Sequence, residues 1–285
     1  MKIVVTGGAG FIGSHLCERL VKDNNIVISI DNYSTGSKDN HVEGVEYIEA
    51  DTNDINNLRL ASVDLVYHLG EYSRVEQSFD DLETVWKSNK NGTFSVLEFC
   101  RKQSCKLVYA GSSTKFGDGG AGRNQSPYGW TKATNTELVL NYQEWFSLPV
   151  AVAYFYNAYG PREIKHDRYA TLVAIFAEKM KRGEQLTVVL PGSQQRNFTH
   201  VFDIVDGLVM VGENGIGDNF GIGCDTTYSI DEVADLFGGM KKYLPERKGN
   251  RLTAEVRTDK TTALGWKSKH TLRDYIENLK LDGWK

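Results

Sequence analysis

Short apolar runs and helical patterns alternate along the first half of the chain. Ile12, Leu16 and Leu20 recur every four residues, which places them on one face of a helix. Further helices are predicted over about 80–102 and from Pro127 to about Phe146. The predicted strands are Ile3–Thr6, Ile26–Asp31, Val45–Glu49, Val63–Leu69, Leu107–Ala110 and the apolar run at 148–156, whose lack of alternation is typical of a strand buried on both faces.

This repetition of strand and helix predicts an α/β fold with a doubly wound parallel sheet and helices on both faces. After about residue 160 the alternation is less regular, and a smaller α/β lobe that also contains Trp266 is expected over 161–285. The capping box SIDE at 229–232 predicts a helix through Phe237. The remaining predictions are helices over 168–182, 203–212 and 271–280 and strands at 186–189 and 252–256.

Composition and charge exclude several classes of protein. The formal net charge of -4 gives no electrostatic reason to expect nucleic acid or an anionic membrane as a partner. The longest apolar stretch is about half of what crossing a bilayer requires, and no secretory signal is recognised, so a cytoplasmic protein is expected. The four cysteines are scattered without metal-binding spacing, and no metal site is expected.

A glycine-rich turn, TGGAGFIG, follows the first predicted strand and opens the first predicted helix. Gly7, Gly10 and Gly13 would let the backbone approach a pyrophosphate, and the helix N-terminus would offer N–H groups and positive potential. Asp31 ends the second predicted strand, where a carboxylate accepts hydrogen bonds from ribose hydroxyls and repels a 2′-phosphate. The pattern predicts a Rossmann-type domain over residues 1–160 that binds NAD rather than NADP.

The stretch SPYGWTK at 126–132 places Tyr128 and Lys132 four residues apart. Ser126 could cap a helix and Pro127 suits its first position, so both later side chains would share one helical face. On spacing alone, an ordinary helix start is the favoured interpretation.

Several stretches together resemble the extended short-chain dehydrogenase/reductase family, in its nucleotide-sugar epimerase and dehydratase branch. They are TGGAGFIG, YAGSSTKFG, the YxxxK pair, YFYNAYGPRE, QQRNFTHVFDIVDG and DKTTALGW, and the similarity covers nearly the whole chain. The resemblance implies that Ser112, Tyr128 and Lys132 are catalytic. It implies substrate contacts at Ser112, Asn157, Arg196 and, with the loosest alignment, Arg247. The implied cofactor contacts are Gly7, Gly10, Phe11, Ile12, Gly13, Asp31, Asn32, Asp51, Tyr128 and Lys132.

The resemblance also implies a reaction. A free phenol has a pKa of about 10, so a tyrosine base that works near pH 7 needs about 4 kcal/mol of stabilisation from nearby cations, here Lys132 and the nicotinamide. Tyr128 would take a proton from a sugar hydroxyl, and NAD would take and return a hydride, which inverts C4 of a nucleotide-diphosphate sugar. An NDP-sugar C4 dehydrogenase or 4-keto-sugar reductase would use the same residues. A non-catalytic dinucleotide-binding protein is the remaining alternative, and a homodimer through helices 80–102 and 128–146 is expected.

Three departures from the family pattern bear on this interpretation. Ser113 and Thr114 stand where the dehydratase branch carries two acids, which argues against a 4,6-dehydratase. Glu71 and Arg74, after the fourth predicted strand, either read a substrate group such as a carboxylate or an extra hydroxyl, or pair with each other at the pocket rim. The glycine-rich stretch 117–126 is shorter than in relatives and is either a flexible, thinner cover over the substrate or, as the favoured interpretation, a loop shortened without functional effect.

Overall fold

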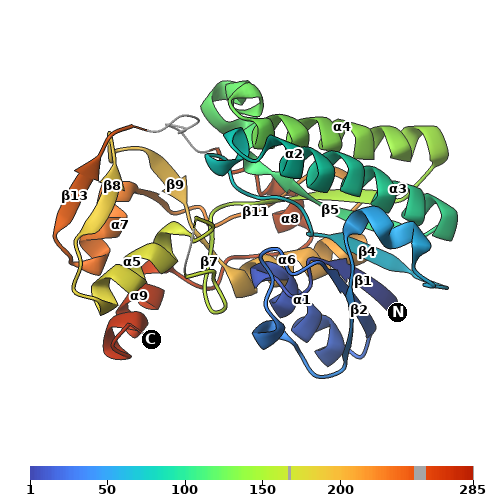
Figure 1. Cartoon of the computed structure of the whole chain (residues 1–285), viewed down its shortest axis with the longest axis horizontal. Coiled ribbons are helices and arrows are strands. Elements are labelled where there is room, and N and C mark those ends of the chain that lie inside the picture. Colours follow the sequence, from blue (N-terminus) through green and yellow to red (C-terminus); the bar gives the residue numbers. More distant parts are fainter. Residues whose placement is uncertain (166–167, 247–254, 285) are drawn as a thin grey trace.

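The computed structural model describes residues 1–165, 168–246 and 255–284. Within them, a parallel sheet of seven strands runs in the order β11-β6-β5-β4-β1-β2-β3 (Figure 1). The order reverses between β1 and β4, which creates the switch point where open α/β sheets bind ligands. The predicted doubly wound parallel sheet is therefore confirmed. Its strands are β1 (Lys2–Thr6), β2 (Ile26–Asp31), β3 (Val45–Glu49), β4 (Leu65–His68), β5 (Lys106–Ser112), β6 (Val150–Phe155) and β11 (Gly217–Ile222).

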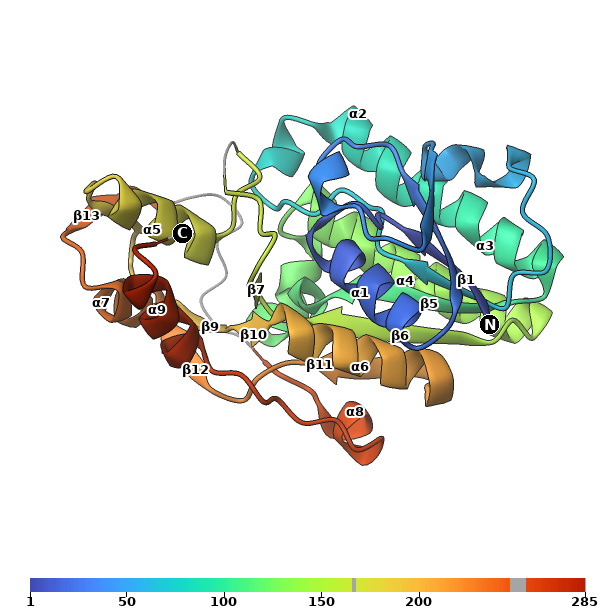
Figure 2. The same cartoon turned by 90° about the horizontal axis from the view of Figure 1, so that it is seen from below.

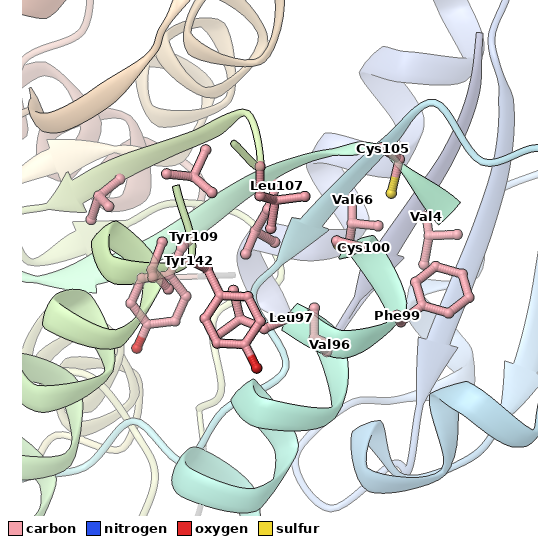
Figure 3. Close-up of a cluster of buried hydrophobic side chains, with 14 of the residues drawn as sticks. Val4, Val66, Val96, Leu97, Phe99, Cys100, Cys105, Leu107, Tyr109 and Tyr142 are labelled. Atoms are coloured by element: carbon pink, nitrogen blue, oxygen red, sulfur yellow. The ribbon is translucent and has the colours of Figure 1, made fainter. Parts of the chain in front are cut away.

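Helices cover both faces of this sheet (Figures 1 and 2). On one face lie α1 (Phe11–Lys22) and α6 (Val201–Asn214), and on the other lie α3 (Gly92–Gln103) and α4 (Pro127–Phe146). Figure 3 shows the apolar cluster on the α3–α4 face, which joins Val66, Leu107 and Tyr109 of the sheet to residues of both helices. The cluster on the other face includes Trp266, whose ring N–H donates to the carbonyl of Asp203 (2.8 Å). The prediction that Trp266 packs within the C-terminal lobe is therefore wrong, because the chain after β11 returns to α6.

The helix predicted over 80–102 is divided into three parts. They are α2 (Leu82–Val85), a π-helical turn η4 (Trp86–Asn91) and α3. The π turn directs Asn89 into the protein, where its side-chain oxygen accepts from the Tyr72 N–H (2.8 Å) and its amide donates to Thr131 Oγ1 (3.1 Å). Such turns commonly occur at functional sites. Here the turn ties α4 to the loop after β4.

A smaller lobe carries a separate apolar cluster. It consists mainly of α5 (Leu172–Lys181), α7 (Ile230–Phe237), α9 (Leu272–Leu281) and the parallel pair β8 (Leu186–Val189) and β13 (Lys241–Leu244). The predicted capping box of α7 is confirmed, since Ser229 Oγ accepts from the Glu232 N–H (3.1 Å) and the Glu232 carboxylate accepts from the Ser229 N–H (2.6 Å). The predicted helix at 168 begins only at Leu172, and the predicted strand at 252–256 lies mostly outside the described residues.

Short elements complete the fold. They are β7 (Ala158–Tyr159), β9 (Gln195–Asn197), β10 (Thr199–His200), β12 (Thr227–Ser229), α8 (Asp259–Ala263), η1 (Lys38–Asn40), η2 (Thr52–Asn57), η3 (Gln77–Phe79) and η5 (Ser113–Asn124). Among the residues that the structure describes, no helix is both long and apolar enough to cross a membrane.

Candidate active site

The carboxyl ends of the parallel strands bring the predicted site residues to one edge of the sheet. Parallel strands present these ends together, and ligands of open α/β sheets bind there. The residues that occupy this edge, strand by strand, are Gly7 after β1, Asp31 at the end of β2, Asp51 after β3, Glu71 after β4, Ser112 at the end of β5 and Asn157 after β6.

The glycine turn has a shape that larger residues could not adopt. Gly7 has a φ of +73°, and a Cβ on Gly13 would lie 2.0 Å from the carbonyl oxygen of Gly7. Gly10 is the N-cap of α1, and no side chain caps this helix. The first-turn N–H groups, including those of Phe11 and Ile12, therefore offer donors and positive potential at an open backbone surface. This cradle fits the diphosphate of a dinucleotide.

Asp31 lies against the glycine turn. Its carboxylate accepts hydrogen bonds from the backbone N–H groups of Ala9 (2.9 Å) and Tyr33 (2.8 Å). Burial raises the pKa of Asp31, while these two hydrogen bonds oppose the rise. Each carboxylate oxygen keeps a lone pair that could accept from a ribose hydroxyl.

Asn32 and Asp51, from adjacent strands, are also brought together. The Asn32 amide donates to the Asp51 carboxylate (3.4 Å), which also accepts from the Asn53 N–H (3.0 Å) and lies 3.5 Å from the Lys87 ammonium. Burial alone would raise the pKa of Asp51, but the Asn53 hydrogen bonds and the Lys87 charge hold it below its usual value. The contact of this pair with adenine stays a prediction.

Ser112 and Tyr128 meet at the start of α4. Ser126 caps this helix through the Gly129 N–H (3.0 Å) and Pro127 occupies its first position, as the sequence predicts. The half-buried Tyr128 hydroxyl donates to Ser112 Oγ at 3.2 Å. Ser112 Oγ is also 2.7 Å from Thr114 Oγ1. A base and a hydroxyl that can hold a substrate oxygen thus lie in one place.

Lys132 lies one turn further along α4 and forms a buried ion pair that the sequence did not predict. Its ammonium donates to the Glu71 carboxylate and to the carbonyl of Ala110, and it lies 4.5 Å from the centroid of the Tyr109 ring. The side chains of Lys132 and Glu71 are 6% and 3% exposed. Burial opposes ionisation of Glu71, but the Lys132 charge, His68 and the hydrogen bonds from Lys132 and Thr93 together outweigh it and hold the Glu71 pKa below its usual value.

Three further donors complete the surroundings of Glu71. They are Thr93 Oγ1 (2.9 Å), Tyr109 Oη (3.1 Å) and Asn135 Nδ2 (3.1 Å). The signal in the sequence was a carboxylate directly after β4, the strand between the glycine-turn strand and the Ser112 strand. That signal was interpreted either as a residue that reads a substrate group or as one of a rim pair with Arg74, but the structure places Glu71 beneath α4, against Lys132.

Arg74 contacts the smaller lobe and does not pair with Glu71. Its guanidinium donates from Nε (2.9 Å) and Nη2 to the carbonyl of Tyr169. The Gln77 amide donates to the carbonyl of Arg168 (2.7 Å), so the loop after β4 is joined to residues 168–169 at two points. The predicted alternative of an Arg74–Glu71 pair at the rim is therefore wrong, because Arg74 bonds to Tyr169 and the buried Glu71 pairs with Lys132.

Asn157 and Arg196, two of the other predicted substrate residues, lie after β6 and on β9. Asn157 has a φ of +37°, and its amide donates to the carbonyl of Asn197 (2.7 Å). Arg196 lies on β9, opposite Tyr228 of β12. Arg247 lies outside the described residues. The contacts of these residues with substrate stay predictions.

The glycine-rich stretch after Ser112 is folded as the 3-10 segment η5 rather than as an open loop. Gly119 and Gly120 adopt φ values of +67° and +93°, which explains the need for glycine at these two positions. Residues of this segment line a cavity of about 410 Å³ together with Glu137 of α4 and Arg257. The stretch is thus built from consecutive tight turns, and its flexibility and its role as a cover stay predictions.

The fold and site together define an NAD-binding enzyme of the Rossmann type. The chain belongs to the NAD-dependent epimerase/dehydratase family, whose pattern matches residues 3–223, and NAD is accordingly its cofactor. UDP-glucuronic acid decarboxylase 5 of Arabidopsis thaliana is 30% identical over 99% of this chain and 89% of that protein.

Two solved structures resemble the fold closely. Pal of Bacillus thuringiensis has a TM-score of 0.90 and 27% identity, with 97% of each chain covered. The UDP-glucose 4-epimerase of Thermus thermophilus in complex with NAD has a TM-score of 0.88 and 26% identity, covering 100% of this chain and 99% of that one. The relatives are named for different reactions, a decarboxylation and an epimerisation, so this similarity alone does not decide the reaction of this chain.

Proposed function

We propose that this enzyme epimerises a nucleotide-diphosphate sugar through a transient 4-keto intermediate, with Tyr128 as both acid and base. The contact between Tyr128 and Ser112 at the sheet edge carries this proposal. Ser113 and Thr114 supply no carboxylic acid beside it, and Thr114 instead hydrogen-bonds Ser112. An elimination that needs an acid at either position is therefore disfavoured.

The residues of the chain have separate parts in this reaction. Tyr128 Oη removes the proton from the sugar hydroxyl, while Ser112 Oγ holds that hydroxyl in reach of the phenolate. Lys132 and the glycine cradle keep the cofactor beside them. Bound NAD supplies the acceptor and donor of the hydride. After the keto sugar has turned over, Tyr128 returns the proton as the opposite face is reduced.

The smaller lobe is proposed to hold the substrate. Arg196 would bind the diphosphate and Asn157 would contact the nucleotide sugar, so the hexose could rotate while its anchor stays fixed. Arg74 would contact the sugar itself, because it lies close enough to Tyr128 to interact with it electrostatically. Residues 161–285 are accordingly proposed to supply most of the substrate lobe, while residues 1–160 bind NAD.

We also propose a homodimer through the helices of the α3–α4 face. Trp86 of η4 and Trp130 of α4 stack with ring centroids 5.8 Å apart and are 47% and 38% exposed. Leu82, Phe94 and Trp145 on the same group of helices are more than half exposed. Such apolar surface typically marks a protein interface.

The first experiment is a product screen with purified protein and NAD. UDP-hexoses and UDP-glucuronic acid are tested first because they appear in the names of relatives, and GDP- and dTDP-hexoses follow. The product is identified by NMR while NADH absorbance is followed. An inverted sugar without accumulating NADH is expected.

Other outcomes would replace the proposal. NADH that rises in step with a keto sugar would identify a dehydrogenase or a reductase running in reverse, and a pentose would identify a decarboxylase. Unchanged sugars across the panel, with protein that binds NAD, would remove the epimerase assignment. Tyr128→Phe should reduce turnover at least about 100-fold while NAD still binds, because the phenyl ring keeps the packing but cannot transfer a proton.

A further inference from the structure

The buried pair of Glu71 and Lys132 changes how the charge of Lys132 can act on Tyr128. Both side chains are almost completely removed from solvent, so water does little to weaken the field of either charge. The carboxylate is in direct contact with the ammonium, and the two fields oppose each other at any third group. Lys132 therefore contributes much less to a phenolate at Tyr128 than an unpaired lysine would.

The hydrogen bonds around Glu71 suit an ionised carboxylate. Its Oε1 accepts from Thr93 Oγ1 (2.9 Å), and its Oε2 faces the Lys132 ammonium. With Thr93 donating to Glu71, the contact between Thr93 and His68 Nε2 (3.1 Å) is donated by the histidine, and His68 Nδ1 accepts from the Thr6 hydroxyl (2.7 Å). Thr6 Oγ1 in turn accepts from the Gly70 N–H (3.0 Å). This arrangement uses Oε1 as an acceptor, and the ammonium beside Oε2 favours the ionised form.

The same contacts hold the ammonium of Lys132 in one position. Of its three N–H groups, one is donated to Glu71 and one to the carbonyl of Ala110. These two contacts leave one N–H of the ammonium for a further acceptor. Glu71 and Ala110 thus fix the position of the Lys132 ammonium.

We propose that Glu71 is a positioning residue that neutralises Lys132 and so sets the pH above which Tyr128 can act as a base. The proposal deepens the function assigned above and rests on it for its catalytic meaning. With Lys132 paired, the positive charge of bound, oxidised NAD becomes the main cation that favours the phenolate. Proton removal by Tyr128 is thereby tied to the oxidised cofactor.

The other ionisable groups around the pair do not replace this effect. Burial lowers the pKa of His68 to about 4, so that ring is neutral near pH 7. The groups that face the pair or Tyr128 from the surrounding elements are His68 on β4, Arg74 on the loop after β4, Lys90 on η4, and Tyr109 on β5. Among these described groups only Glu71 is a carboxylate, so Glu71→Gln makes the net charge around Tyr128 more positive.

The test is a titration of the Tyr128 phenolate by difference absorbance, with Tyr128→Phe protein as the blank and without substrate. In Glu71→Gln, the phenolate should form about one pH unit lower than in the wild type, because an uncompensated Lys132 then favours it. Glu137→Gln is the matched control, since it removes an exposed carboxylate from α4, the helix that carries Tyr128 and Lys132, and should shift nothing. Glu71→Asp keeps the charge and should stay within about half a unit of the wild type.

A second comparison decides the question if Glu71→Gln does not fold. The double variant Glu71→Gln/Lys132→Met removes both charges, and its Tyr128 phenolate should form at nearly the wild-type pH. A wild-type phenolate that forms about one unit or more below that of the double variant would show Lys132 acting as an unpaired cation and overturn the proposal. An unshifted Glu71→Gln titration would overturn it as well.

The titration needs no sugar, so its result stands apart from the proposed function. Where a substrate is turned over, the acidic limb of the kcat/KM profile should move to lower pH in Glu71→Gln by the same amount. Loss of all sugar turnover with the titration shift intact would remove the epimerase assignment and leave the role of Glu71 in place. Sugar epimerisation with no shift in either the titration or the kcat/KM profile would keep the epimerase assignment and overturn the role of Glu71.

Discussion

Replacing either Glu71 or Lys132 alone by an uncharged residue should strongly lower the free energy of unfolding, whereas replacing both should lower it only slightly. Removing one partner of a buried pair typically costs about 3–5 kcal/mol, because the other charge is left uncompensated. Lys132→Met should lower the free energy of unfolding by about 3 kcal/mol, the lower end of this range, since Thr93, Tyr109 and Asn135 still donate to Glu71. Glu71→Gln should cost as much or more, because Lys132 keeps only neutral acceptors.

The double variant Glu71→Gln/Lys132→Met should lose only about 1–2 kcal/mol, since no charge stays buried. The resulting coupling energy is about 4 kcal/mol or more, well above the error of such a cycle. Urea unfolding at pH 8 measures all four proteins, and each single variant should also lose roughly 6–10 °C in Tm. Additive losses would show that the two side chains do not interact as the structure describes.

The pH dependence of this coupling follows from the lowered pKa of Glu71. A carboxylate whose pKa is lowered by folding contributes stability above its unfolded pKa of about 4.3 and loses it as the pH falls through the folded value. The coupling energy should therefore be constant between about pH 6 and pH 9 and should shrink only in acid. A coupling that fell within the neutral range would contradict an ionised Glu71.

Three further predictions concern other parts of the molecule. Burial raises the pKa of Glu163 to about 7. The protonated side chain therefore contributes fully to the free energy of unfolding below about pH 4.5, and this contribution is lost as the pH rises through 7. In urea unfolding, Glu163→Gln should be about 3 kcal/mol more stable than the wild type at pH 8 and equally stable at pH 4. Asp31→Ala should weaken NAD binding about 10- to 100-fold in calorimetry and reduce the ratio of NAD affinity to NADP affinity. An unchanged ratio would count against a contact between Asp31 and the ribose. Trp130→Glu should convert a dimer into a monomer in light scattering, and a wild-type mass near 31.9 kDa would remove the dimer proposal.

Local chemistry made much of the fold and cofactor site predictable from the sequence. The α1 face of Ile12, Leu16 and Leu20, the Ser229 capping box and the glycine turn each depend on residues within a few positions of one another. Three strands, β2, β3 and β8, have the predicted bounds, because their apolar runs end at polar or turn-forming residues. Periodicity, caps and backbone freedom act over such short distances, and so they can be read along the chain.

Tertiary packing decided what Glu71, Arg74 and Trp266 do. Glu71 lies 61 residues before Lys132, and Arg74 lies 95 before Tyr169, so neither partner could be inferred from neighbours in the sequence. A glutamate after a strand predicts a polar residue at the edge of a sheet, but its depth beneath α4 depends on how closely the helix packs against β5. The sequence by itself therefore determined the Rossmann-type sheet and the NAD cradle, while the Ser112–Tyr128–Lys132 set was predicted from the resemblance to a known family. The tertiary structure alone decided which charges share the buried space behind that set, because charge pairing depends on distances set by the packing of whole elements.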